Sequence, residues 1–272
     1  MTIAICLKVG DGIVLGADSA STLMTGGGVE NVYFNAEKIF NLRKGLPIGA
    51  VTYGLGGIGG RSVNHLAKDL RRLLTEEYSD WYLSPETYTM EEVAQRVRAF
   101  FHSYLYVQDY PPGRDSPCPP IGFTIAGYSA GAAQPEVWSV EVDAAGVCPP
   151  PRLVFDRDAS GVAHWNGQPE ALNRLFMGYS DATFDRLVKA GVPAADATNL
   201  LVSWNPLARP GMPIQDAIDL VQYMADVTVG FVKFSSGAPV VAPPIDLVAI
   251  TVHERFRWVR RKHYYAPELK PD

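Results

Sequence analysis

The sequence predicts an α+β fold built as a single domain. The predicted elements come in segregated blocks, with strands, two helices, strands, helices and a final pair of strands, an order typical of α+β layering. The chain of 272 residues is 47% apolar, so it can bury a sizeable core as one unit. It has no internal repeat, and its proline-rich stretches are too short to be domain linkers. We therefore expect one domain over residues 1–272, with loop insertions near 78–89 and 108–120.

The chain opens on a predicted β-hairpin. Residues 2–9 alternate in polarity, the Gly10-Asp11-Gly12 stretch is a turn signal, and residues 13–17 form a second apolar run. A loop made of Gly10-Asp11 places Thr2 opposite Ser19, whereas a loop made of Asp11-Gly12 places it opposite Ser21. In either register Thr2 lies beside the end of the second strand.

The first block continues through residue 54, for which we expect four short strands in all. The third contains residues 36–42 and carries Lys38, and the fourth covers 48–53. A glycine-rich turn then leads to an amphipathic helix over about 61–77. A second helix follows Thr89, which is a suitable cap residue, and runs over about 90–107.

The second half of the chain alternates between strand and helix patterns in longer blocks. Strands are expected over 121–128, 137–142 and 152–156, and helices over about 169–189, 194–204 and 212–234. Residues 246–253 and 255–260 are expected to close the chain as paired strands.

Residues 2–19, Thr-Ile-Ala-Ile-Cys-Leu-Lys-Val-Gly-Asp-Gly-Ile-Val-Leu-Gly-Ala-Asp-Ser, resemble the start of a proteasome β-type subunit. The resemblance extends over residues 2–75, including Lys38 and the glycine-rich turn after residue 53. It implies a four-layer αββα sandwich of the N-terminal nucleophile (Ntn) hydrolase type, assembled into rings or ring-like spirals around an inner chamber.

The resemblance also implies a set of functional residues. Thr2 would be the nucleophile once Met1 is removed, with its own α-amine as general base. Lys38 would stabilise the alkoxide, Asp18 would hold Lys38 charged, and the backbone of Gly54 would form an oxyanion hole. The expected substrate-binding residues are Ala20, Ser21, Thr22 and Thr52. Taken singly, Asp18 fits a strand-end cap and Lys38 an exposed edge charge equally well.

The late-chain motifs of the family match less closely. The family has a supporting Ser in mid-chain, where this sequence has Asn166, and an Asp-x-x-Ser-Gly motif near its end. Here Ser236-Gly237 keeps the Ser-Gly pair with Lys233 in place of the acid, so Ser236 is included among the catalytic candidates. An alternative placement uses Pro243-Pro-Ile-Asp246, which resembles a motif of the Anbu branch of bacterial proteasome-like proteins. The sequence leaves both placements open.

Other function classes fit the sequence less well. The net charge of −5 provides no basic field for nucleic acid, no apolar run is long enough to span a membrane, and the histidines lack metal-ligand spacing. Three cysteines without metal spacing indicate reduced thiols, and no secretion signal follows Met1, so we expect a cytoplasmic protein without cofactor or metal. Gly54-x-Gly-x-x-Gly59 is a literal dinucleotide fingerprint, but no βαβ unit surrounds it, and we interpret it as a strand-to-helix turn. The basic strip 255–263 is interpreted as a terminal strand or a tail that docks on a neighbouring subunit.

The sequence therefore predicts a proteasome-like threonine peptidase whose partners are peptide or unfolded-protein substrates and other copies of the chain. It leaves open whether an unfoldase acts with the protein. Three alternatives stay open: a ring-forming protein with weak or no activity, a small-molecule Ntn amidase and, least favoured, a dinucleotide-binding enzyme.

Overall fold

Two antiparallel five-stranded sheets form the body of the protein. The computed structural model describes residues 2–25, 28–114, 116–201 and 207–262. The first sheet has the order β12-β1-β2-β13-β14 and contains β1 (Ile3–Val9), β2 (Gly12–Ala17), β12 (Val162–Gly167), β13 (Asp246–Thr251) and β14 (Arg255–Arg260). The second has the order β11-β10-β9-β6-β5 and contains β5 (Ile39–Asn41), β6 (Ile48–Gly54), β9 (Ile121–Gly127), β10 (Glu136–Val142) and β11 (Arg152–Phe155).

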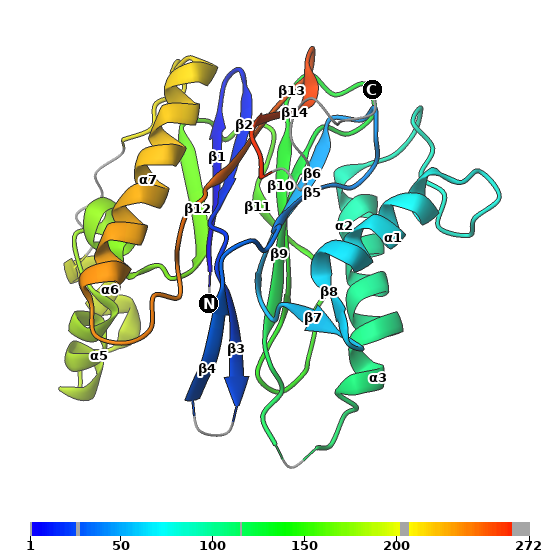
Figure 1. Cartoon of the computed structure of the whole chain (residues 1–272). Coiled ribbons are helices and arrows are strands. Elements are labelled where there is room, and N and C mark those ends of the chain that lie inside the picture. The colour runs from blue at the N-terminus through cyan, green and yellow to red at the C-terminus, as the bar shows by residue number, and fades with distance from the viewer. Residues whose placement is uncertain (1, 26–27, 115, 202–206, 263–272) are drawn as a thin grey trace.

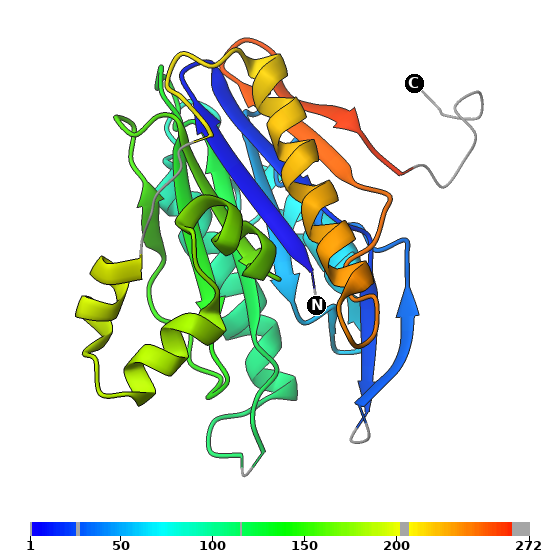
Figure 2. The same ribbon diagram turned by 90° about the vertical axis from the view of Figure 1, so that its left-hand side faces the viewer.

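Helices cover the outer face of each sheet (Figure 1). Helix α7 (Ile214–Phe234) lies across β1 and β2 of the first sheet, as the turned view also shows (Figure 2). The second sheet is covered by α1 (Val63–Thr75) and by a continuous helical segment composed of α2 (Met90–Arg98), a π-helical stretch η1 (Ala99–Tyr106) and α3 (Val107–Asp109). The prediction of an α+β protein is confirmed.

Strand β1 shows how the alternating sequence positions the layers. Ile3, Ile5 and Leu7 point to the cluster under α7, whereas Ala4 and Cys6 point to the cluster between the sheets. Every residue of β1 is buried because both of its faces are covered. Helix α7 approaches so closely that a Cβ on Gly16 of β2 would lie 2.4 Å from a methyl carbon of Val221.

The register of the opening hairpin is the one in which Gly10 and Asp11 form the loop. Val9 pairs with Gly12 and Ala4 pairs with Ala17. Continued by two residues, this register places Thr2 opposite Ser19. The glycine-rich turn after residue 54 forms a small hairpin, β7 (Gly57–Ile58) and β8 (Arg61–Ser62), before Ser62 caps α1. All pairings in the described sheets are antiparallel, so the interpretation of this turn as a strand-to-helix connection is confirmed.

Several element predictions were wrong. Residues 2–54 hold six strands instead of four, because β3 (Ser21–Thr25) and β4 (Gly28–Tyr33) form a hairpin that extends from the body (Figure 1). Strand β12 was not predicted. The helix expected over 169–189 is divided into α4 (Glu170–Leu172), η2 (Asn173–Met177) and α5 (Asp181–Lys189), because Gly178 adopts a left-handed conformation that ends the first part.

The remaining predictions agree with the structure to within a few residues. Thr89 caps α2 by accepting a hydrogen bond from the N–H of Glu92, and the helical segment runs on to Asp109, so the following loop begins at residue 110. The short helix α6 (Ala194–Leu201) lies where one was expected, and residues 202–206 fall outside the described residues. No helix among the described residues is long and apolar enough to cross a membrane.

Candidate active site

Thr2 lies at the start of β1, where the first sheet meets the β3–β4 hairpin. It is 3% exposed and lines a cavity of about 190 Å³, which we call the Thr2 cavity. Gly167 of β12 packs against its backbone so tightly that a Cβ there would lie 1.9 Å from the Thr2 carbonyl oxygen. Met1 lies outside the described residues.

The Thr2 cavity is lined by most of the residues that the sequence singles out. Its lining includes Thr2, Ala20, Ser21, Thr22, Lys38, Thr52 and Gly54. These residues come from the starts of β1 and β3, the segment before β5, and β6. Chain segments that are up to 52 positions apart by residue number thus meet around one small volume.

Lys38 and Asp18 form a buried ion pair beside this cavity. The Lys38 Nζ lies 2.6 Å from Asp18 Oδ1, and the two side chains are 7% and 0% exposed. Asp18 also accepts hydrogen bonds from three backbone N–H groups, those of Ile3 at 3.0 Å, Ala20 at 2.8 Å and Ala242 at 3.2 Å. A buried carboxylate with this many donors is well compensated. It also fixes Ile3, the residue that follows Thr2.

Burial and neighbouring charges shift the pKa of Lys38. Removal from water lowers the pKa of its ammonium group, the Asp18 carboxylate opposes this effect, and the nearby positive charge of Lys262 adds to it. The result is a lysine with a pKa below its ordinary value, on the same cavity as Thr2. Such a group can place positive charge near a developing alkoxide with little water to screen it.

The end of β6 forms another part of the cavity wall. Gly54 has a φ of +88°, and a Cβ there would lie 2.3 Å from the carbonyl oxygen of Pro120, so only glycine fits. The hydroxyl of Thr52 donates to the Gly122 carbonyl at 3.0 Å, and the Thr52 N–H donates to the Lys38 carbonyl at 2.9 Å. Thr52 thereby ties the strand before Gly54 to the segment that carries Lys38.

The late-chain residues do not all join this cavity. Ser236 is exposed in the turn after α7 and is not among the lining residues. Asn166 lies on β12 opposite Ala4, and its side chain contacts His164 with nitrogens 2.7 Å apart. Asp246, the alternative acid, is fully buried and pairs with Lys262.

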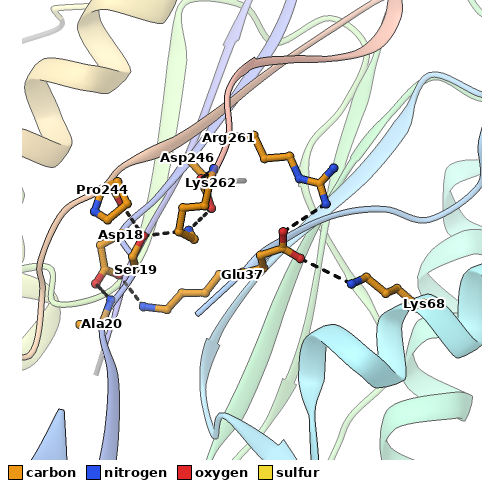
Figure 3. Close-up of polar contacts among 10 residues, drawn as sticks. Asp18, Ser19, Ala20, Glu37, Lys68, Pro244, Asp246, Arg261 and Lys262 are labelled. Carbon is orange, nitrogen blue, oxygen red and sulfur yellow. Dashed lines mark hydrogen bonds and ion pairs between the residues drawn. The ribbon is translucent and has the colours of Figure 1, made fainter. Parts of the chain in front are cut away.

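Sequence reasoning missed three residues around the Asp18–Lys38 pair. Ser19, Glu37 and Lys262 form a second polar layer next to it (Figure 3). Ser19 and Glu37 are the chain neighbours of Asp18 and Lys38, a signal that the sequence did contain. Lys262 belongs to the basic strip, whose residues 255–260 form β14 and pair with β13 of the same chain.

Among the described residues there is no group of His, Cys, Asp or Glu side chains that could hold a metal ion. Cys6, Cys118 and Cys148 are free and buried.

Comparison with known proteins supports the fold. No protein-family model matches the sequence, and no curated protein matches it either. Among solved structures, a Gly-1 mutant of Anbu from Hyphomicrobium sp. strain MC1 is similar, with a TM-score of 0.53 and 17% identity over 98% of this chain and 88% of that chain. The chain thus shares the fold of Anbu, and the resemblance drawn from the opening hairpin is confirmed at the level of fold.

Proposed function

We propose that this protein is a threonine-type hydrolase of the four-layer αββα Ntn class, which uses Thr2 as an N-terminal nucleophile after Met1 is removed. The observation that carries the proposal is the placement of Thr2 and Lys38 on one cavity with a fully buried Asp18 behind the lysine. Each of these residues has an ordinary explanation by itself. An exposed edge lysine, however, would not be buried against a carboxylate that also accepts three backbone N–H groups.

The proposed reaction begins with attack of Thr2 Oγ on a substrate carbonyl carbon. The α-amine of Thr2 accepts the hydroxyl proton, directly or through one water, and the Lys38 ammonium stabilises the negative charge. The backbone N–H of Gly54 is assigned to the oxyanion of the tetrahedral intermediate. Expulsion of the amine product, which takes up the proton, leaves an ester on Thr2. Water then attacks the ester, releases the acid and restores the hydroxyl.

The substrate class that we propose is peptides. Ser21 and Thr22 of β3 line the cavity together with Gly54 and Gly56, so an extended segment that enters it could pair with backbone there. Strand β4 occupies only one edge of β3, by the pairs Ser21–Tyr33 and Thr22–Val32.

A small amide is the second candidate substrate. The cavity of about 190 Å³ is smaller than the roughly 300–1,000 Å³ of typical ligand sites, which favours a compact acyl group. A peptidase would bind a single side chain there and leave the rest of the peptide along β3. An amidase would enclose its whole substrate.

Self-association is part of the proposal. Large apolar side chains are exposed on the β3–β4 hairpin, including Leu23 at 45%, Tyr33 at 55% and Phe34 at 43%. Exposed apolar patches of this kind mark interaction sites. A ring or spiral of identical subunits would cover them and place the cavities in an enclosed space.

The test combines intact mass with activity and covalent labelling. The mature protein should lack the mass of one methionine, cleave short fluorogenic peptides, and carry a mechanism-based electrophile on Thr2. Thr2→Ala should reduce turnover by at least about 10³-fold, because it removes the nucleophilic hydroxyl and leaves only the α-amine. Thr75→Ala, which removes a hydroxyl on the surface of α1, is the matched control.

Three outcomes would redirect the proposal. Full activity in Thr2→Ala would overturn the nucleophile assignment. A retained Met1 with no labelling would favour an inactive assembly, because the α-amine would be blocked. Turnover of small amides but not of peptides would favour the amidase.

A further inference from the structure

The end of the described chain returns to the candidate active site. Lys262 follows β14, and its Nζ donates to Ser19 Oγ at 2.8 Å and pairs with the carboxylate of Asp246 (Figure 3). The Lys262 backbone N–H donates to Asp246 Oδ1 at 3.0 Å. The side chains of Lys262 and Asp246 are 9% and 1% exposed, so this contact is internal and is not a surface salt bridge.

Ser19 connects Lys262 to the residues on either side of the ion pair. Its hydroxyl accepts from Lys262 and donates to the carbonyl of Pro244. Its backbone N–H donates to the Ala242 carbonyl, and its carbonyl accepts from the Ala36 N–H, both at 3.0 Å. Ser19 directly follows Asp18, and Ala36 lies two residues before Lys38. A shift of Ser19 would therefore move both partners of the Asp18–Lys38 pair.

Arg261 makes a parallel contact on the other side. Its guanidinium lies 3.1 Å from a carboxylate oxygen of Glu37, whose side chain is only 3% exposed. Lys68 of α1 approaches the other oxygen at 3.8 Å, so Glu37 lies between two cations. The Arg261 guanidinium also lies over the ring of Trp258, 4.9 Å from its centre. Glu37 directly precedes Lys38 and lines the Thr2 cavity.

We propose that Arg261 and Lys262 form a clamp that holds Ser19 and Glu37, and through them positions Asp18 and Lys38 beside Thr2. Both are positioning residues, since neither lines the cavity. The catalytic consequence of the clamp rests on the proposed function; its structural consequence does not. Displacement of a catalytic group by about 1 Å can reduce turnover by about 10²-fold, so a modest loosening here should be measurable.

The decisive variant is the double substitution Asp246→Asn with Lys262→Met. Lys262→Met alone would leave the Asp246 carboxylate buried without a partner, and the chain could fail to fold for that reason. The double variant removes both charges at similar volume and keeps an acceptor for the backbone N–H of residue 262. We expect its unfolding midpoint to stay near that of the unaltered chain, its kcat to fall about 10- to 100-fold and its KM to change by less than about twofold.

Two further variants separate positioning from charge compensation. Lys262→Arg keeps a cationic donor for Ser19 and should retain most of the turnover. Arg260→Gln alters a residue two positions before Lys262, which contacts Gln222 on α7, and should leave kcat unchanged. If the double variant turns over substrate at the full rate, Lys262 only neutralises Asp246 and the clamp is refuted.

Amide hydrogen exchange tests the clamp without any activity. In the double variant the N–H groups of Ser19 and Ala36 should exchange at least about tenfold faster, while those in α1 should not change. Activity of Thr2→Ala, measured in the same series, reports separately on the proposed function. Unchanged exchange at Ser19 and Ala36 would refute the clamp even if Thr2 proves to be the nucleophile. Faster exchange would support the clamp even if Thr2 proves inert.

Discussion

Lys38 is buried against a carboxylate, and this affects both its chemistry and its pH dependence. Burial lowers the pKa of Lys38, and Asp18 limits the decrease. In the proposed mechanism only the protonated lysine is useful. Activity should therefore fall on the alkaline side at a pH below the ordinary lysine value of about 10.4.

Asp18→Asn tests this interpretation at the residue scale. Loss of the Asp18 carboxylate removes the charge that favours protonated Lys38, so the pKa of Lys38 falls further. The alkaline limb of kcat against pH should move to lower pH, with a reduced maximum. Circular dichroism would confirm that the variant is folded, and an unmoved limb would show that Lys38 does not govern it.

Gly167 is a second position where one residue sets the geometry of the site. Its φ is +98°, and an added Cβ would meet the Thr2 carbonyl. Gly167→Ala should destabilise the protein by at least about 1–2 kcal/mol from backbone strain alone and should displace Thr2. Chemical denaturation measures the effect. Gly211→Ala, where a Cβ meets nothing within 4 Å, should change the free energy of unfolding by less than about 0.5 kcal/mol.

At the scale of elements, helix α7 provides a matched pair of glycine substitutions. Gly230 lies inside the helix, and a Cβ there meets nothing within 4 Å. Gly230→Ala should stabilise the protein by up to about 1 kcal/mol and raise Tm. Gly16→Ala, which faces the same helix from β2, should lower Tm because its Cβ would overlap Val221. A loss of stability in both would show that α7 packs differently.

The elements also show where sequence patterns were sufficient and where they were not. The opening hairpin was predictable because residues 2–9 alternate in polarity and a glycine turn signal follows them. In the structure both faces of β1 are covered. Strands β3 and β4 were missed because their hairpin lies outside the core, with mixed burial, and its Gly26–Gly28 stretch resembled an insertion. Strand β12 was missed because His164 and Asn166 interrupt its apolar pattern. Gly178 marks the break, but the residues on either side of it follow a helical period, and the sequence pattern therefore indicated one continuous helix.

The residues of the candidate site were predictable to the extent that they lie near the start of the chain. Thr2, Lys38 and Gly54 are local features of successive strands, and the family resemblance supplied their roles. Lys262 was not predictable, because its contact with Ser19 spans 243 positions and no local pattern records such a partner. Ser236 was placed by a Ser-Gly pair alone. Its exposed position gives that prediction no support from the cavity.

At the scale of the whole molecule, His164 reports on how the two sheets pack. It lies on β12, and burial lowers its pKa; the positive charge of Arg152 on β11 adds to this, while Glu141 on β10 opposes it. The unfolded chain therefore binds a proton more readily than the folded one near pH 6.5. Stability should decrease as pH falls through that range, because protonation favours unfolding.

Urea denaturation between pH 8 and pH 5 measures this linkage. The slope of the free energy of unfolding against pH should be smaller in His164→Gln than in the unaltered chain. Thr75→Ala, which changes an exposed residue of α1 and no titratable group, is the control and should keep the original slope. Equal slopes in all three proteins would mean that His164 titrates alike in the folded and unfolded states.

Strand β2 lies between β1 and β13. The carboxylate of Asp18, which follows β2, accepts a hydrogen bond from the backbone N–H of Ala242, 224 residues further along the chain. During synthesis on the ribosome, the first forty residues emerge long before their partners from the last strands. A nascent chain therefore cannot complete the polar surroundings of Asp18 and Ser19 until translation has passed residue 262.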